Sequence, residues 1–177
     1  TPRVAEALAR TKLPHLDQAN ESDMNLLTRL GQRFNAVATV KAGSLLFAPI
    51  GAGTTSTGKP LPTVTLTRRD GDQHRYSVAD RDAYTGVRAY WVDKGKARRQ
   101  SVLVGTDDNA KRLRESYADE ATARQHAHAE LERVKRGVAK FNYTLAIGRA
   151  DLFPEQPITA SGFKPDIDGP RWLIAKT

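Results

Sequence analysis

A short glycine-rich segment comes closest to a chemical motif in this sequence. Gly53-Thr-Thr-Ser-Thr-Gly58-Lys59 matches the first seven positions of a phosphate-binding loop, in which backbone N–H groups and the lysine hold phosphates. The next position needs a serine or threonine hydroxyl for magnesium, but Pro60 stands there. A β-rich segment, Thr63 to Thr67, replaces the helix whose N-terminus would face the phosphates. These departures argue against nucleotide binding and favour a flexible linker.

Two other patterns suggest a metal site. His126 and His128 are two positions apart, so on a helix their side chains diverge by about 200° and cannot share one ion. Asp166-Ile-Asp168-Gly169 resembles the opening of a calcium loop, but Pro170 interrupts it and the later ligands are missing. The first pattern favours surface histidines and the second a tight turn. We therefore expect no metal site.

The sequence also lacks a pattern typical of a catalytic centre. Asp107, Asp108 and Asn109 favour a turn or helix cap over an acid–base pair, and there is no Gly-x-Ser-x-Gly elbow. The chain contains no cysteine, which excludes disulfides, thiolate metal ligands and cysteine nucleophiles. We expect no catalytic residue, no cofactor and no enzymatic activity.

The composition is typical of a globular protein with a modest core. Of the 177 residues, 39% are hydrophobic and 27% are charged, which suits one ordinary domain or two small ones. No apolar run approaches the roughly 18–20 residues that span a bilayer. The chain begins Thr1-Pro2-Arg3 without an initiator methionine, so we expect it to be an excised part of a longer protein.

The net charge of +8 and the pI near 9.9 would suit a polyanionic partner. One dense basic cluster forms a possible interaction surface and consists of Lys94, Lys96, Arg98 and Arg99. A second cluster, at residues 133–140, falls where a helix is expected to end, and cations there complement the helix dipole. Both clusters are typical of a solvated surface, and contact with nucleic acid is the alternative.

A capped amphipathic helix is predicted over residues 22–35. Ser22 can accept a hydrogen bond from the first free N–H groups of the helix, and Asp23 places negative charge at its positive end. Apolar residues recur with the spacing of one helix face from Leu27 onward. Ser22 and Asp23 are therefore predicted to form a structural helix cap.

A β-hairpin over residues 36–48 is predicted to follow this helix. Gly43 supplies the positive φ that its turn needs. The segment 51–62 is rich in glycine, threonine and proline, which favours a linker. We therefore expect a small α+β module over residues 1–58, with a domain boundary before residue 59.

Residues 59–177 are predicted to form an antiparallel, partly closed β-barrel flanked by one longer helix, which makes the fold class α+β. Alternating residues around a turn at Asp70-Gly71 indicate a hairpin. Further strands are expected on both sides of the basic turn that contains Lys94. An aspartate cap and a following run of alanine, glutamate and arginine indicate the helix over 119–136. The next strand is expected to bury an alternating face of Phe141, Tyr143, Leu145 and Ile147.

Four segments carry a resemblance to a known family. They are Gln18 to Asp23 (QANESD) with the leucines that follow, the hairpin with Gly43 before a Leu-x-Phe strand, Asp82 to Tyr90 (DAYTGVRAY), and the ending made of Gly148 to Pro154, Ser161 to Lys164 and Trp172 to Ile174. In this order they resemble the C-terminal part of the phage late control D family. Its members are tail hub proteins of contractile-tailed phages, related to the hub domain of type VI secretion spike proteins. Family members usually continue beyond Thr177, so we expect the last barrel strands to be missing.

The resemblance implies a structural component of a phage or prophage tail baseplate hub, which joins the tail tube to the spike and is needed for tail assembly. Hubs of this family are trimeric rings, whose barrel-like domains present pseudo-sixfold symmetry to a hexameric tube. The expected partners are two further copies of the chain, the tube protein and the spike protein. The expected location is the virion tail, after synthesis in the cytoplasm of the bacterial host. The alternative is a basic DNA- or RNA-binding module, whose affinity would fall steeply with salt.

Overall fold

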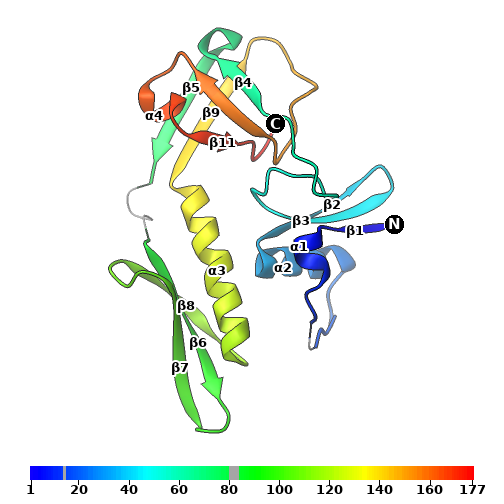
Figure 1. Ribbon diagram of the computed structural model, residues 1–177, viewed down its shortest axis with the longest axis vertical. Helices are drawn as coiled ribbons and strands as arrows, with labels where there is room; N and C mark the ends of the chain where they lie inside the picture. Colours follow the sequence, from blue (N-terminus) through cyan, green and yellow to red (C-terminus); the bar gives the residue numbers. More distant parts are fainter. Residues whose placement is uncertain (14, 80–83) are drawn as a thin grey trace. The chain divides into compact units, whose positions relative to one another are not determined.

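The computed structural model describes residues 1–13, 15–79 and 84–177 and is drawn in Figure 1. The fold is a mixed α+β arrangement with several small sheets, so the predicted class is confirmed. The chain forms two compact units. The first consists of Thr1–Leu16, Val37–Ser77 and Lys140–Thr177, and the second of Asp17–Ala36 and Val78–Ala139. Among the described residues, no helix is both long and apolar enough to span a membrane.

The second unit is built on a three-stranded sheet in the order β7-β6-β8. β6 (Gly86–Asp93) pairs antiparallel with β7 (Arg98–Gly105) and parallel with β8 (Ala110–Tyr117). The hairpin of β6 and β7 around the basic turn confirms the prediction for this part of the chain. The strand β8 was not predicted, because most of its residues are charged or small and give no apolar alternation.

A short crossing over residues 106–109 carries the chain from β7 past the start of β6 to β8. Gly86 pairs with Gly105 on one side and with Ala110 on the other. A Cβ at Gly86 would lie 2.0 Å from the carbonyl oxygen of Thr106, and Gly105 has φ +88°. Glycine is therefore needed at both positions, because a side chain would either clash with the crossing backbone or strain it.

The helix α3 (Glu120–Gly137) covers one face of this sheet (Figure 1). It begins after Asp119, whose side chain accepts a hydrogen bond from the N–H of Thr122 at 2.7 Å, and its bounds lie within one residue of the predicted range 119–136. The small side chains of Ala123 and Ala127 allow the helix to lie close to the strands. The buried core between helix and sheet consists of Val87, Ala89, Val102, Ala123, Ala127 and Leu131.

The helix α2 (Asp23–Phe34) packs against α3 within the second unit. The Nε of Arg33 donates a hydrogen bond to the side chain of Gln125 at 3.1 Å. The guanidinium of Arg136 donates a second one to the side chain of Asn35. Asn35 also ends the helix, in the left-handed conformation with φ 51°. The helix thus lies inside the predicted range 22–35.

One sheet of the first unit has the order β1-β3-β2. β2 (Ala36–Lys41) and β3 (Ser44–Pro49) are joined by Ala42 and Gly43, which both have positive φ (47° and 70°). Two consecutive residues with positive φ are typical of the two-residue hairpin turn whose backbone twist matches that of the flanking strands. β1 (Pro2–Val4) adds to β3 in parallel, and the short helix α1 (Glu6–Ala9) follows it.

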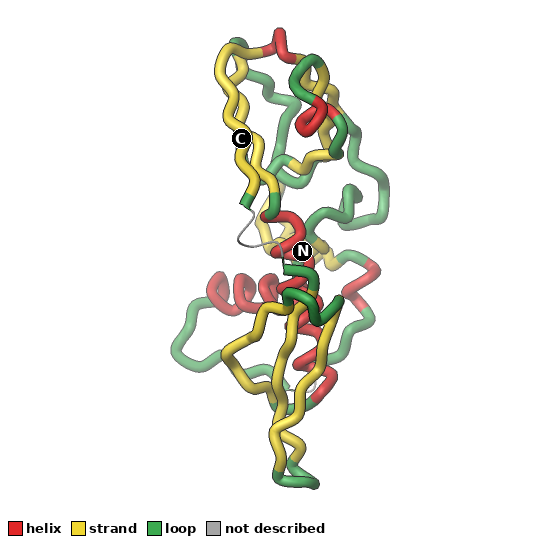
Figure 2. Tube along the Cα trace, turned by 90° about the vertical axis from the view of Figure 1, so that its left-hand side faces the viewer, coloured by secondary structure: helices red, strands yellow, loops and turns green. Residues whose placement is uncertain are grey.

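Two further sheets belong to the first unit, one in the order β11-β10-β4 and one made of β5 and β9. β10 pairs antiparallel with β11 and parallel with β4. The elements are β4 (Val64–Thr67), η1 (Arg68–Asp70), β5 (Gly71–Val78), β9 (Ala139–Leu145), β10 (Pro157–Ser161), α4 (Pro165–Asp168) and β11 (Arg171–Leu173). A loop over residues 146–156 connects β9 to β10, and Figure 2 draws the loops of the chain in green.

The antiparallel, partly closed barrel predicted for residues 59–177 is not seen among the described residues, whose strands in this range lie in three separate sheets with two parallel pairs. One cause is the turn at Asp70, which was predicted to join the two strands of a hairpin. The Oδ2 of Asp70 accepts a hydrogen bond from the N–H of Thr67 at 2.6 Å, which stabilises η1 as a helical turn. β4 and β5 therefore enter different sheets.

The predicted boundary before residue 59 falls inside the first unit. The segment around it is held to the last part of the chain, because the N–H of Gly51 donates to Glu155 Oε2 at 2.9 Å. The ammonium of Lys41 also lies 5.2 Å from the ring centre of Phe153. Independent folding of residues 1–58 stays a prediction.

The strand β9 presents an alternating face of Phe141, Tyr143 and Leu145, all half-buried. The hydroxyl of Tyr143 donates to the carbonyl oxygen of Thr67 at 2.8 Å. The prediction is wrong for Ile147, which lies beyond the end of β9 and is 80% exposed. The strand β9 ends before Ile147. The N–H of Ala146 still donates a hydrogen bond to the carbonyl oxygen of Asp70 at 2.9 Å.

The core beneath α3 predicts a large effect for Leu131→Ala. Leu131 is 4% exposed, so its truncation leaves a cavity that should lower the free energy of unfolding by about 2–5 kcal/mol. Urea denaturation followed by circular dichroism measures this change. Val92→Ala in the same unit is the control, since Val92 is 44% exposed. Equal effects of the two substitutions would contradict the assigned core.

The ion pairs of Glu130 predict a dependence of stability on pH. Burial disfavours the charged carboxylate, but hydrogen bonds from Lys111 and Arg133 outweigh it and hold the pKa of Glu130 below its ordinary value of 4.5. A lowered pKa in the folded state stabilises the protein above the ordinary pKa, and this contribution disappears as the pH falls through the lowered value. Glu130→Gln should therefore destabilise at about pH 7 but much less at about pH 3.

Urea midpoints at the two pH values test this expectation. Glu132→Gln is the matched control, because Glu132 pairs only with Lys135 among the described residues, at 3.3 Å and on the surface. The same pH dependence in both variants would contradict the role assigned to Glu130.

Candidate functional site

The segment that resembles a phosphate-binding loop is closed on itself. The N–H of Thr55 donates to the carbonyl oxygen of Lys59 at 2.7 Å, and the N–H of Leu61 to that of Gly53 at 2.7 Å. The hydroxyl of Thr55 accepts a further bond from the N–H of Lys59 at 3.1 Å. Because these N–H groups are already used, they cannot cradle a phosphate. The segment forms a hydrogen-bonded turn in place of the predicted flexible linker.

The histidines of α3 do not converge on a common point. His126 is half-buried and stacks on the ring of Tyr117, with centroids 4.3 Å apart, whereas His128 is exposed. Burial, and then the nearby charge of Arg33, lower the pKa of His126. Within residues 1–13, 15–79 and 84–177, no group of three histidine, aspartate or glutamate side chains could hold a metal ion.

Ser22 stands at the N-cap of α2. Its Oγ accepts a hydrogen bond from the N–H of Asn25 at 3.3 Å. Asp23 lies in the first turn, where its charge offsets the helix dipole. The Oδ1 of Asp23 also accepts a bond from the side chain of Gln18 at 2.7 Å. The cap therefore ties the segment before the helix to its first turn.

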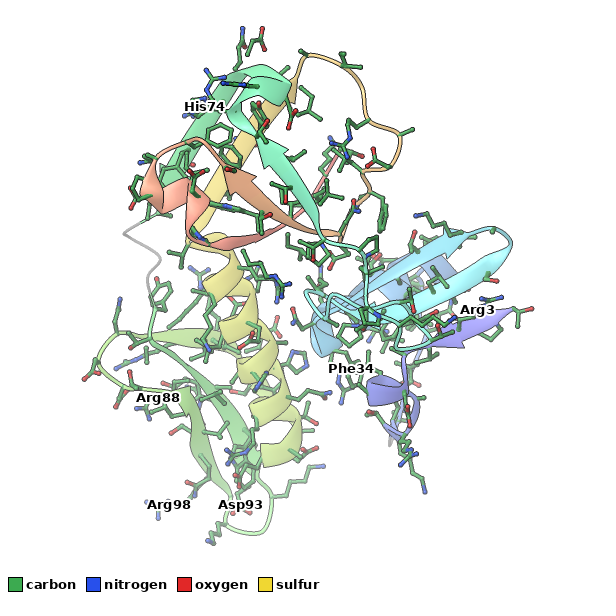
Figure 3. All side chains as sticks on the ribbon, turned by 45° about the horizontal axis from the view of Figure 1, so that its top comes forward. Arg3, Phe34, His74, Arg88, Asp93 and Arg98 are labelled. Atoms are coloured by element: carbon green, nitrogen blue, oxygen red, sulfur yellow. The ribbon has the colours of Figure 1, made fainter. Side chains whose placement is uncertain are left out.

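The four basic residues predicted as a possible interaction surface do not share one face of the molecule. Lys94 and Lys96 lie on the turn between β6 and β7, where the Oδ1 of Asp93 accepts two backbone N–H groups at 3.0 and 3.2 Å. Arg98 and Arg99 are neighbours on β7, so their side chains leave opposite faces of the sheet. In the strand register, Arg98 lies opposite Asp93 near the turn end of the hairpin (Figure 3).

A different basic surface lies on the face of the sheet away from α3, which we call the open face. Val87 and Ala89 of β6 point into the core, so the alternate residues of this strand point to the open face. The strand registers place its residues in three rows. These rows are Leu103–Arg88–Arg112, Ser101–Tyr90–Ser116 and Arg99–Val92. No described helix or strand of the second unit lies over them.

Two arginines of the open face are fixed by contacts within it. The guanidinium of Arg88 (labelled in Figure 3) donates to Asp107 Oδ2 at 2.6 Å and to the hydroxyl of Ser101 at 3.3 Å. The hydrogen bond to Asp107, together with its charge, raises the pKa of Arg88. The guanidinium of Arg99 lies 3.9 Å from the ring centre of Tyr90, which is a favourable cation–π geometry. These side chains are thus ordered before any partner binds.

Arg88 and Arg112 were not predicted as surface residues. The alternation of β6 could have placed Arg88 opposite the core, since Val87 and Ala89 flank it. No comparable signal exists for Arg112. It lies in the strand that was not predicted, beside a register shift between β6 and β8.

Comparison with known proteins identifies the family of this chain. The family model for the phage tail baseplate hub (GPD) matches residues 2–177. The chain belongs to the phage tail baseplate hub family. It is 41% identical over 217 residues to a probable baseplate hub protein of Escherichia phage 186 and 39% identical over 213 residues to that of Escherichia phage P2. These alignments cover 99% and 98% of the chain, so the resemblance to the late control D family is confirmed.

The chain spans about half the length of these relatives, 56% and 55% respectively. Two solved structures share its fold. The prophage tail protein gp18 from Listeria monocytogenes EGD-e matches with a TM-score of 0.56 and 10% identity, over 98% of this chain and 52% of that one. A chain in the virion of a native gene transfer agent matches with a TM-score of 0.57 and 16% identity, over 86% and 35%. The family supports a structural role in the phage tail baseplate and a location in the virion tail.

The cap of α2 predicts that Ser22→Ala lowers the free energy of unfolding by about 1 kcal/mol, because the N–H of Asn25 loses its partner. Ser22→Asn should retain most of the stability, since asparagine is an equally good cap. Urea denaturation measures both changes. Equal losses of unfolding free energy in the two variants would contradict the role of the Ser22 side chain as a helix cap.

Proposed function

We propose that this chain is the C-terminal part of a hub protein that joins the tail tube to the spike of a phage or prophage and is needed for tail assembly. The observation that carries this proposal is the family match over residues 2–177. The chain covers only about half of its curated relatives, so the tube and spike partners belong to the proposal. The protein would reach the virion tail after synthesis in the host cytoplasm.

The proposed role is structural and not enzymatic. A joint between two assemblies depends on complementary surfaces and unpaired strand edges, and it needs no nucleophile or metal. The proposed oligomer is a homotrimer, in which three chains with barrel-like domains match a hexameric tube. The support for both statements is the structural character of the family to which the chain belongs.

The proposal includes a barrel that is completed on assembly. The sheets of the first unit are short, and among the described residues their outer strands have unpaired edges. A cluster of half-buried rings lies between them and consists of Phe141, Tyr143, Phe163 and Trp172. Strands from the rest of the hub polypeptide or from neighbouring chains would pair the edges and bury more of the rings.

Genetic removal of the full-length protein tests the proposal. Cells that carry the phage or prophage without this gene are expected to release no assembled tails, as seen by negative-stain electron microscopy. Supplying the complete gene from a plasmid should restore them. Normal tails and unchanged infectivity without the protein would overturn the hub assignment.

The net charge of +8 keeps the nucleic-acid-binding alternative open to a direct test. Duplex and single-stranded oligonucleotides are titrated with the chain at about 50 mM salt, where phosphate contacts are strong. The hub proposal expects no binding. Tight binding that weakens steeply as salt is raised would favour the alternative, because counterion release has this signature.

A further inference from the structure

The open face has the composition of a protein-binding surface. Its three rows hold three arginines, one tyrosine, two aliphatic residues and two serines, with neither lysine nor glutamate. Arginine and tyrosine are enriched at protein interfaces, whereas lysine and glutamate are depleted. Val92 is 44% exposed in the last row. The opposite face of the same sheet is covered by α3, so within the described part of the second unit the open face is the one that no helix or strand covers.

We infer that the open face binds a protein surface that carries carboxylates. Arg88 and Arg112 are direct neighbours in the β6–β8 register, and like charges in this position destabilise a sheet. Asp107 compensates only one of them, through its bond to Arg88 at 2.6 Å. An approaching carboxylate would offset the remaining repulsion between the two guanidinium groups. Binding of such a partner would therefore relieve a destabilising interaction of the isolated chain.

Two guanidinium groups on the open face are ready to receive such carboxylates. Arg99 and Arg112 are exposed. Among the described residues, neither forms an ion pair with an acidic side chain. The guanidinium carbon of Arg99 lies 3.9 Å from the ring centre of Tyr90, and a guanidinium can form a bidentate bond to a carboxylate. A side chain ordered in advance loses less entropy on binding.

The apolar residues of the open face favour a protein over a nucleic acid. Val92 and Leu103 offer aliphatic surface beside the arginines, which a protein interface can bury. Lys94 and Lys96, which would suit phosphates, lie on the turn beyond the face.

The inference rests on the proposed function, because the partner is then another protein of the assembled tail. It is tested in the full-length hub by placing a thiol on the open face. This chain contains no cysteine, so Ser101→Cys and Ser116→Cys each add one site within it. Arg124→Cys, on an exposed position of α3, is the matched control. Maleimide labelling is followed by mass spectrometry in the free hub protein and in purified tails.

The expected result is labelling at least tenfold slower in tails than in the free hub for Ser101→Cys and Ser116→Cys, with little change for Arg124→Cys. Equal labelling in both states would overturn the inference but leave the hub assignment intact. Absence of the protein from purified tails would overturn both. Protection that nuclease treatment removes would identify a nucleic acid as the occupant and overturn the protein partner.

Charge reversal tests the chemistry of the partner. Arg99→Glu and Arg112→Glu should each reduce the amount of hub protein per tail several-fold, whereas Arg124→Glu changes it little. Because Arg99 also contacts Tyr90, thermal unfolding of each free variant shows whether the fold persists. Normal incorporation of folded Arg99→Glu and Arg112→Glu variants would overturn the requirement for carboxylates.

Discussion

The close packing of α3 on β6 is the interaction on which the second unit depends. Val87 and Ala89 on the strand and Ala123 and Ala127 on the helix are all fully buried. Small side chains at these positions bring the helix near the sheet, where a leucine or phenylalanine would hold it away. The helix α2 in turn is held to α3 by the hydrogen bonds from Arg33 to Gln125 and from Arg136 to Asn35.

The same packing divides the sheet into two faces with different properties. One face is covered by α3 and forms the buried core that stabilises the unit. The other is lined by arginines whose positions follow from the strand registers and from contacts with Asp107 and Tyr90. Such a division suits a component of a larger assembly, because one side of the element secures the fold while the other can be matched to a neighbour without disturbing the core.

Local signals in the sequence predict the helices and the tight turns well. Ser22 and Asp119 each mark a helix start by a bond to a nearby backbone N–H, and the turn at Gly43 needs its positive φ. Long-range pairings were not predictable in the same way. β8 joins β6 in parallel although its own residues give no strand pattern, and Asp70 forms a helical turn where a hairpin was expected. The open face could be predicted only in part, since it depends on three strands meeting in one register.

The interleaving of the two units has a consequence for biosynthesis. Residues 78–139 of the second unit are contiguous and leave the ribosome together, so their helix and sheet can form while the rest of the chain is still being made. The first unit cannot be completed at that stage, because β4 finds its partner β10 only after residues 157–161 have been synthesised. The sheet β1-β3-β2 can form early, whereas β4 must wait for β10 before its own sheet can form.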